Sequence, residues 1–262
     1  MKKMLKCLAI VMAAAMGAAV FAACSKSAAY TVATNAQFKP FEYMEGSNMV
    51  GLDIDLVNDI ADHAGFTVTI NDMEFEAVIT SVQKGVSDFG AAGLTITEDR
   101  QQNVDFSDPY YISHQEVIVR TGDPMADLST ADDVNAALIG KTIGVCTGFT
   151  GSDYVKGENG YPGIEGATAK QYPNISLAIA DLRNGQVDAV IMDNVPATQA
   201  AAADANKGLV TVIDIPLTDE EYGIVVKNGN TELLGKINAA IAQFKVDGTL
   251  DDLVAKWITN AQ

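Results

Sequence analysis

The sequence predicts an α/β fold made of two lobes, each a mostly parallel sheet flanked by helices. Short apolar strands alternate with amphipathic helices along the chain, which is the pattern of strand–helix–strand units. The alternation stops at the polar segment 121–133, which we expect to lie outside the core, and then restarts. About 230 residues follow the N-terminal segment, enough for two lobes of roughly 100 residues each.

In the first half, each helix pattern ends at a glycine, the residue that suits a left-handed helix cap. The amphipathic segments 51–65 and 76–84 end at Gly65 and at Gly85. Apolar or alternating runs around these helices predict strands at 30–34, at 66–71 and from Asp88 onward. Residues 35–43 are predicted to form a loop.

The second half repeats this organisation. Strands are predicted at 116–120, 142–145, 187–192, 210–215 and 223–227, and helices from 150, at 174–182, 194–206, 233–244 and 250–258. Two segments are similar, ITSVQKGVSD at 79–88 and IADLRNGQVD at 179–188, which supports two related lobes. We expect Asp88 and Asp188 to be structural residues at strand starts.

The N-terminal segment 1–23 has the composition of an export signal, with a basic start, an apolar run and small residues before Cys24. The apolar run is too short for a membrane span, which needs about 20 apolar residues. Cys24 follows two alanines and resembles a lipoprotein processing site, so we expect it to carry a lipid and residues 24–29 to form a tether. The alternative is an ordinary cleaved signal that leaves Cys24 unmodified.

The chain carries a formal net charge of −17. This acidity disfavours nucleic acid and anionic lipid headgroups as partners, so membrane contact is expected only through the lipid. With Cys7 in the signal and Cys24 lipidated, Cys146 has no disulfide partner, and we interpret it as a small buried apolar residue rather than a reactive thiol. His63 and His114 lie far apart in the chain, so no metal site is expected, and no cofactor either.

The stretch 88–111, DFGAAGLTITEDRQQNVDFSDPYY, carries the strongest functional signal. Thr97 is a favourable N-cap and two acids follow it, so a helical turn begins there and Arg100 lies where a strand gives way to a helix. A guanidinium at such a place can bind a carboxylate through two parallel hydrogen bonds. Taken alone, Arg100 would be interpreted as a solvated surface residue.

AGLTITEDR and VDFSDPYY in this stretch, with GLDIDL from Gly51, resemble the bacterial extracytoplasmic solute-binding proteins of family 3. These are the amino-acid-binding components of ABC importers, and the resemblance covers residues 30–258. It implies a two-lobed, periplasmic-binding-protein-like fold of type II. Lobe 1 would comprise 30–113 and 222–262, and lobe 2 would comprise 114–221. The chain would then cross between the lobes near Ser113 and Glu221.

Matched to the family's motifs, the residues predict a site for the carboxylate of a free amino acid. We expect Arg100 to bind it, with the Thr95 hydroxyl and the backbone around Gly93 beside it. Thr150 and Gly151 open a helix whose free N–H groups favour an anion and add a second source of donors. The glycine-rich turn before that helix lacks the Gly-Lys-Ser/Thr of a P-loop, so no nucleotide is expected.

For the ammonium we expect Asp193, because ligands gather at the C-terminal ends of strands in open α/β sheets. Its alternative role is the N-cap of the following helix, and a carboxylate can serve both. Phe38 and Phe75 match places where the family has a covering aromatic residue. Phe149 stands where the family more often has a small polar residue. All three are predicted to wall the pocket, although each could instead be a core residue.

The uncharged pocket neighbours Asn35 and Met192, with the apolar Phe149, predict a neutral amino acid as the ligand. Glu42, Glu74 and Glu76 keep a cationic amino acid as the second possibility. We therefore expect a lipid-anchored, extracytoplasmic monomer without chemistry of its own, whose lobes close on the amino acid and which delivers it to an ABC permease.

Two other classes of protein are alternatives to this function. One is an enzyme of similar fold, like the periplasmic cyclohexadienyl dehydratases, for which only Glu42 or Glu74 could be nominated as the general acid. The other is a sensor domain, which we do not expect because no second transmembrane segment or signalling domain accompanies the lobes.

Overall fold

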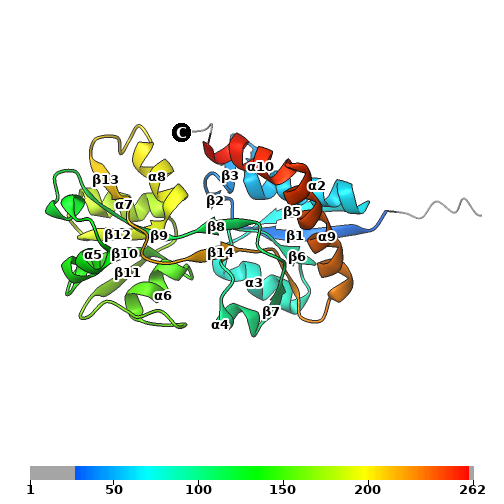
Figure 1. Ribbon diagram of the computed structural model, residues 1–262, viewed down its shortest axis with the longest axis horizontal. Coiled ribbons are helices and arrows are strands. Elements are labelled where there is room, and N and C mark those ends of the chain that lie inside the picture. Colours follow the sequence, from blue (N-terminus) through cyan, green and yellow to red (C-terminus); the bar gives the residue numbers. More distant parts are fainter. Residues whose placement is uncertain (1–26, 260–262) are drawn as a thin grey trace, which may run out of the picture.

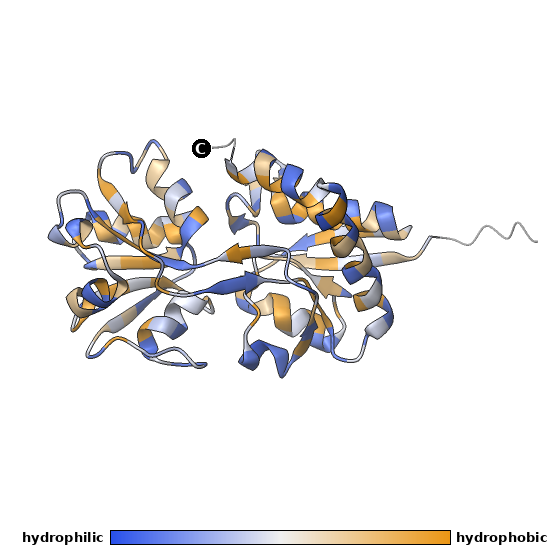
Figure 2. Ribbon diagram, viewed as in Figure 1, coloured by the Kyte–Doolittle hydropathy of each residue, from blue (hydrophilic) through white to orange (hydrophobic). Residues whose placement is uncertain are grey.

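The computed structural model describes residues 27–259, which form two α/β lobes side by side (Figure 1). The expected signal segment, Cys24 and the first residues of the expected tether lie outside the described residues. Hydrophobic residues concentrate on the strands and on the helix faces that pack against them (Figure 2). Within the described range, every helix is too short or too polar to span a bilayer.

The sheet of the first lobe, within residues 27–259, has the strand order β5–β1–β6–β15–β7. Strand β1 (Ala29–Thr34) lies parallel to β5 (Thr67–Asp72) and to β6 (Phe89–Gly90). Strand β15 (Val225–Lys227) arrives from far along the chain and runs antiparallel to β6 and to β7 (Val104–Phe106). The sheet is therefore mixed, parallel where consecutive strand–helix units build it and antiparallel where the returning strand enters.

The sheet of the second lobe has the same plan, in the order β11–β10–β12–β9–β13. Strand β10 (Thr142–Cys146) lies parallel to β11 (Thr168–Tyr172) and to β12 (Ala189–Asp193). Strand β9 (Gln115–Arg120) runs antiparallel to β12 and to β13 (Val210–Ile213). The two α/β lobes predicted from the sequence are thus present, and each sheet combines parallel and antiparallel pairs.

The helices begin and end largely where the local signals place them. Gly65 and Gly85 adopt left-handed backbone angles after α2 and α3, and the Thr97 and Asn174 side chains cap α4 and α7. The helices of the described chain are α2 (Leu52–Ala64), α3 (Phe75–Lys84), α4 (Glu98–Gln101), η1 (Pro124–Asp127), α5 (Ala131–Leu138), α6 (Thr150–Lys156), α7 (Ile175–Arg183), α8 (Asn194–Ala202), α9 (Thr231–Asp247), α10 (Thr249–Val254) and η2 (Ala255–Thr259).

Two antiparallel strands lie between the lobes (Figure 1). They are β8 (Tyr111–Ser113) and β14 (Glu220–Tyr222), and they include Ser113 and Glu221, near which the sequence predicts the crossings. The Ile96 N–H donates to the Glu221 carbonyl at 2.8 Å, so β14 is also tied to the first lobe. We call this connection of β8 and β14 the hinge.

Several segments differ from the sequence prediction. A three-stranded sheet of β2 (Gln37–Phe38), β3 (Glu42–Glu45) and β4 (Asn48–Val50) replaces most of the predicted loop. The polar segment 121–133 lies mostly outside the core, as predicted, except that η1 buries Met125 in the core of the second lobe. Strand β11 forms although its sequence, TAKQY, lacks an apolar run, because it pairs with β10 along its whole length.

Asp88 and Asp188 have the same role in the two lobes. The Asp88 Oδ2 atom accepts a hydrogen bond from the Thr31 N–H at 2.7 Å, and Asp188 Oδ2 accepts one from the Thr142 N–H at 2.9 Å. Thr31 lies in β1 and Thr142 in β10, and each of these strands is the middle one of the three parallel strands in its lobe. Each aspartate therefore holds the start of its lobe's parallel strands, the structural role expected from the similar segments.

Candidate functional site

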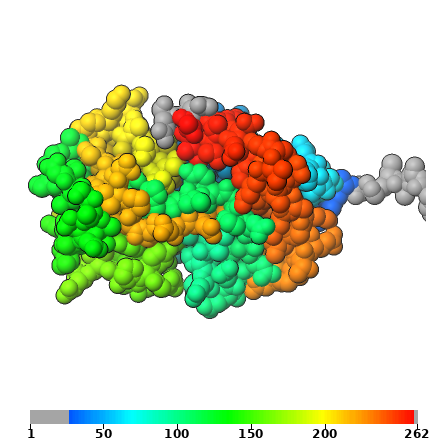
Figure 3. Space-filling model, viewed as in Figure 1, coloured from blue at the N-terminus to red at the C-terminus, as the bar shows by residue number. Residues whose placement is uncertain are grey.

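Residues from both lobes meet around one buried cavity. Its lining contains eight of the predicted site residues: Phe38, Phe75, Gly93, Thr95, Arg100, Phe149, Thr150 and Asp193. The cavity has a volume of about 10 Å³, close to the space that one water molecule needs and far too small for an amino acid. The two lobes touch along their boundary (Figure 3), so they must separate before a ligand can enter.

Arg100 joins the two lobes. The Thr97 cap starts the turn that carries it, and the side chain is 8% exposed. One guanidinium N–H donates to the Thr95 carbonyl at 2.8 Å, and another donates to the Gly148 carbonyl of the second lobe at 3.0 Å. Burial lowers the pKa of Arg100, and the carboxylate of Glu220 is the charge that most opposes this. A guanidinium has five N–H groups, so donors remain for an anion.

Asp193 is the buried acid at the other side of the cavity. It ends β12 and occupies the N-cap position of α8, as the alternative interpretation expected, but its side chain makes no capping hydrogen bond. Instead, its Oδ1 atom accepts a hydrogen bond from the Tyr222 hydroxyl at 2.6 Å. Burial, and next the charge of Glu220, raise the pKa of Asp193 to about 7. An ammonium beside Asp193 would favour the ionised form.

Glu220 belongs to the site although the sequence reasoning missed it. Its carboxylate, on β14, accepts hydrogen bonds from the Thr95 hydroxyl at 2.8 Å and from the Thr150 hydroxyl at 2.9 Å. Alternate residues of a strand face the same side, so a buried Tyr222 places Glu220 on the inner face as well. That alternation was the available signal, but β14 itself was not predicted.

Three phenylalanines form the apolar wall of the cavity. The Phe149 ring of the second lobe lies 4.2 Å from the Phe75 ring and 5.4 Å from the Phe38 ring, between ring centroids. The Arg100 guanidinium lies 5.5 Å from the centroid of Phe75. Gly93 has a φ of +53°, and a Cβ atom there would come within 2.4 Å of the Phe38 ring. Only glycine therefore lets the backbone lie against this aromatic wall.

Three predicted residues do not line the cavity. The Asn35 side chain donates to the Met73 carbonyl at 2.8 Å and so supports the start of the loop before α3. Met192 is a core residue with 2% exposure. Gly151 lies in the first turn of α6, where a Cβ atom would come within 2.7 Å of the Gln115 side chain. Their role in binding stays a prediction.

A pair of buried carboxyl groups lies behind Gly93. The Asp53 carboxylate accepts hydrogen bonds from the Gly93 N–H at 2.9 Å and from the Tyr110 hydroxyl at 2.7 Å. The adjacent Glu42 is fully buried, and neither of its carboxyl oxygens finds a donor among the described residues. Burial, and next the charge of Asp53, raise the pKa of Glu42 well above its usual range. Burial therefore favours the protonated form of the Glu42 carboxyl group over its charged form.

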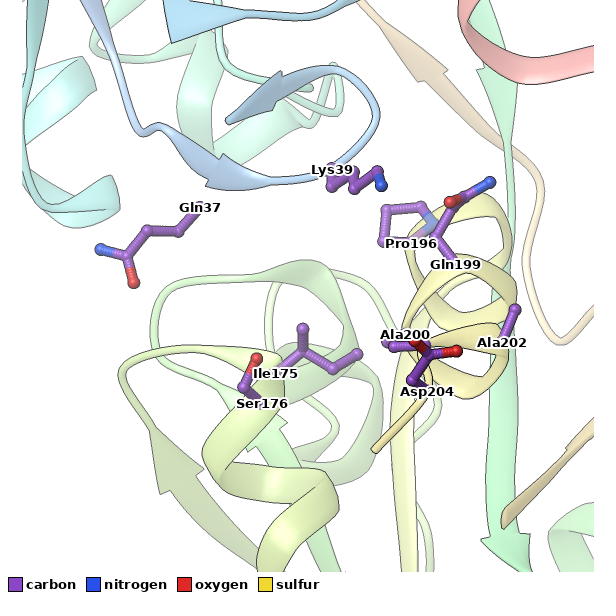
Figure 4. A pocket seen from close by; sticks show the side chains of 10 residues that line it. Gln37, Lys39, Ile175, Ser176, Pro196, Gln199, Ala200, Ala202 and Asp204 are labelled. Atoms are coloured by element: carbon purple, nitrogen blue, oxygen red, sulfur yellow. The ribbon is translucent and has the colours of Figure 1, made fainter. Parts of the chain in front are cut away.

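A wider groove of about 520 Å³ lies elsewhere on the boundary between the lobes. In Figure 4, Gln37 and Lys39 lie on one side, and Ile175 and Ser176 at the start of α7 lie on the other. The described residues that line it include none of those predicted for the site. The smaller cavity remains the candidate site, because buried charges of both signs converge there.

The comparisons with known proteins show the family of this chain. Residues 30–260 match the model of a protein family described as bacterial extracellular solute-binding proteins, family 3. A probable histidine-binding protein of Neisseria gonorrhoeae is 31% identical over 229 residues, which cover 87% of this chain and 82% of that protein.

Two solved structures are also similar. The structure of an ancestral arginine-binding protein bound to glutamine is 37% identical, with a TM-score of 0.76 and coverage of 87% of this chain and 97% of that one. An ancestral amino-acid-binding protein, described as a precursor of cyclohexadienyl dehydratase, is 29% identical, with a TM-score of 0.74 and coverage of 88% and 95%.

Gly93→Ala is expected to destabilise the protein by about 1–3 kcal/mol, because the new Cβ combines a strained φ with a clash against Phe38. Calorimetric melting measures the loss. Gly46→Ala is the matched control, since Gly46 also has a left-handed φ, +64°, but no atom within 4 Å of an added Cβ. Equal melting temperatures of the two variants would contradict the close packing at Gly93.

Glu42→Gln is expected to be more stable than the wild type at alkaline pH and equally stable near pH 4. The folded pKa of Glu42 is raised, so the wild type loses stability as pH rises above the unfolded value of about 4.3, by at most about 1.4 kcal/mol per pH unit. Glutamine keeps a donor toward Asp53 without titrating.

Melting temperatures measured across this pH range test the proton on Glu42. Glu45→Gln, at an exposed position of the same strand, is the control and should follow the wild-type profile. If Glu42→Gln also follows the wild-type profile at every pH, Glu42 does not hold a proton in the folded protein.

Proposed function

The chain belongs to family 3 of the bacterial extracellular solute-binding proteins, and we propose that it captures a free amino acid between its lobes for an ABC importer. One observation carries the proposal: Arg100 from the first lobe and Asp193 from the second line the same buried cavity. A free amino acid offers a carboxylate to the guanidinium and an ammonium to the aspartate. Opposite charges at 4 Å interact by about 4 kcal/mol at an effective dielectric of 20, before desolvation.

Closure of the lobes would couple binding to recognition by the importer. The cavity is enclosed by residues of both lobes, and the β8–β14 hinge is the two-stranded connection between their sheets. A ligand that touches both lobes stabilises the closed state over the open state by its differential contacts. The permease would then distinguish the loaded protein from the empty one by its shape.

The site favours a polar amino acid with a flat side-chain end. The faces of Phe38, Phe75 and Phe149 suit an amide, an imidazole or a guanidinium. The sequence favours a neutral ligand, but the charges of two buried acids, Asp193 and Glu220, act on one buried arginine, Arg100. This charge balance favours a cationic ligand, so we place arginine and histidine first and glutamine next. Relatives named for binding histidine, and a similar arginine-binding protein whose structure contains glutamine, support this group of ligands without ranking its members.

The location follows from the family and the N-terminal sequence. Family 3 proteins are extracellular solute-binding proteins, and we propose that this chain acts as a monomer outside the cytoplasmic membrane. Attachment would be through a lipid on Cys24 after removal of residues 1–23, so that the lobes stay near the permease.

An enzyme on the same fold is the second candidate, supported by the similarity to a precursor of cyclohexadienyl dehydratase. Two acids were nominated for it. Glu42 is buried outside the cavity, and Glu74 is exposed at the start of α3, so neither is among the described residues that line the cavity. Incubation with prephenate or arogenate tests this candidate, and turnover of either would favour the enzyme.

A thermal-shift screen of the common amino acids tests the proposed function. At least one amino acid is expected to raise the melting temperature, because a ligand that binds only the folded state adds RT ln(1 + [L]/Kd) to its stability. Arg100→Ala and Asp193→Ala are each expected to weaken binding by about 3 kcal/mol, roughly a hundredfold in Kd, and to abolish the shift.

Two exposed charges serve as controls for the screen. Lys141→Ala removes a surface cation and Asp251→Ala a surface anion, and both variants should keep the wild-type shift. No shift with any amino acid, or full shifts in the Arg100 and Asp193 variants, would refute the proposal.

The affinity of the wild type is expected to fall at acid pH. Asp193, whose pKa is raised to about 7, must lose its proton before it can pair with an ammonium. Affinity should therefore be constant above about pH 8 and fall by up to about tenfold per pH unit below about pH 6. Titration calorimetry in two buffers of different ionisation enthalpy should also detect the released proton near neutrality.

Asp193→Asn separates this titration from other effects of acid. Asparagine cannot ionise, so the variant should bind more weakly and without the change near neutral pH. A wild-type affinity that stays constant from about pH 5 to about pH 8 would mean that Asp193 is already ionised before the ligand arrives.

A further inference from the structure

Glu220 is a buried carboxylate surrounded by hydroxyl groups. It is 3% exposed. Its Oε2 atom accepts hydrogen bonds from the hydroxyls of Thr95 at 2.8 Å and Thr150 at 2.9 Å. Its Oε1 atom accepts hydrogen bonds from the hydroxyls of Thr218 at 3.0 Å and Tyr161 at 3.3 Å. Two carboxylate oxygens offer about four lone-pair sites, so these four donors use the whole acceptor capacity of the group.

This arrangement fixes the direction of each hydroxyl. A hydroxyl has one proton and two lone pairs, and an ionised carboxylate can only accept. The single O–H of each of these four groups therefore donates to Glu220. Toward any other neighbour, each hydroxyl oxygen can only accept a hydrogen bond. Thr150 illustrates this, because its oxygen accepts a further hydrogen bond from the Gln115 side chain at 3.2 Å.

The consequence reaches the cavity through Thr95 and Thr150, which both line it. A hydroxyl that can only accept cannot form a hydrogen bond with a carboxylate, because an ionised carboxylate has no donor. It can accept a hydrogen bond from an ammonium, which has three N–H donors. This differs from the sequence interpretation of the Thr95 hydroxyl as a donor to the ligand carboxylate.

We propose that Glu220 is a positioning residue that sets the polarity of the site by holding the Thr95 and Thr150 hydroxyls as acceptors. The ammonium of a bound amino acid then lies beside Asp193 and these hydroxyls, and the carboxylate is left to Arg100 and backbone N–H groups. The inference rests on the proposed function, since it concerns how the same site orients an amino acid. Glu220 acts through the threonines and does not itself line the cavity.

Glu220→Gln is the direct test, because it keeps the shape of the side chain and replaces one acceptor oxygen by an amide that donates. The two hydroxyls that contact the amide nitrogen can then no longer donate to residue 220. Their O–H groups must rotate, and they become free to donate to another acceptor. The probes are matched pairs with and without the α-ammonium: L-arginine with 5-guanidinopentanoate, and L-glutamine with glutaramate. In the wild type each amino acid should bind more tightly than its deaminated partner.

The readout is the ratio of the two dissociation constants within a pair, measured by titration calorimetry. Glu220→Gln should reduce the preference for the amino acid by about tenfold or more, the effect of a lost hydrogen bond to a charged group. The affinity for the deaminated partner should change little. Glu221→Gln, the exposed neighbour on the same strand, should keep the wild-type ratio.

A general loosening of the fold would weaken both members of a pair by the same factor, and that result would overturn the inference while leaving the proposed function intact. Failure of the wild type to bind any amino acid would remove the proposed function and this inference with it. Thr95→Val covers the case in which Glu220→Gln does not fold. It removes the acceptor without changing the side-chain shape and should lower the same ratio, so an unchanged ratio overturns the inference.

Discussion

The site depends on the burial of opposite charges that come from different lobes. Arg100 and Asp193 are almost completely removed from water, and burial disfavours the charged form of each, as their shifted pKa values indicate. A buried charge without a partner destabilises the closed state by several kcal/mol. A zwitterion brings one partner to each charge in the closed state and to at most one of them in the open state. Under the proposed function, binding and closure would for this reason be a single event.

The protein accommodates its other buried acids in two different ways. Glu42 finds no hydrogen-bond partner among the described residues, and burial raises its pKa and so favours its uncharged form. Glu220 instead has a hydroxyl donor at each of its acceptor positions. Glu42 lies next to Asp53, and Asp53 accepts a hydrogen bond from the Gly93 N–H, so this pair of acids holds the backbone at Gly93. The Glu220 carboxylate instead lies close to the cavity and orients the hydroxyl groups that donate to it.

The parts of this structure that follow from the sequence are those set by neighbours within a few residues. Gly65 and Gly85 end helices because of their own backbone freedom, and Thr97 caps the turn of Arg100 through a contact three residues away. The cavity residues could be chosen because the family motifs carry them.

Contacts between distant parts of the chain were not predictable in this way. Glu220 lies 125 residues from Thr95 and 70 from Thr150, and no local pattern indicates that three elements bring these side chains together. Strand β11 depends in the same manner on its partner β10, since its own sequence lacks an apolar run.

The position of Glu220 on the hinge connects the polarity of the site to closure. On one side of it, the Glu221 carbonyl accepts from Ile96 of the first lobe, and on the other, the Leu217 N–H donates to Gln115 of the second lobe. If the lobes separate as proposed, Thr95 and Thr150 would move apart, and one Oε2 atom could not keep both hydroxyls within hydrogen-bonding distance. A hydroxyl that no longer donates to Glu220 could then donate to another acceptor. Under the proposed function, either end of a zwitterion could contact that hydroxyl in the open state, and only closure would impose the orientation with the ammonium at Asp193.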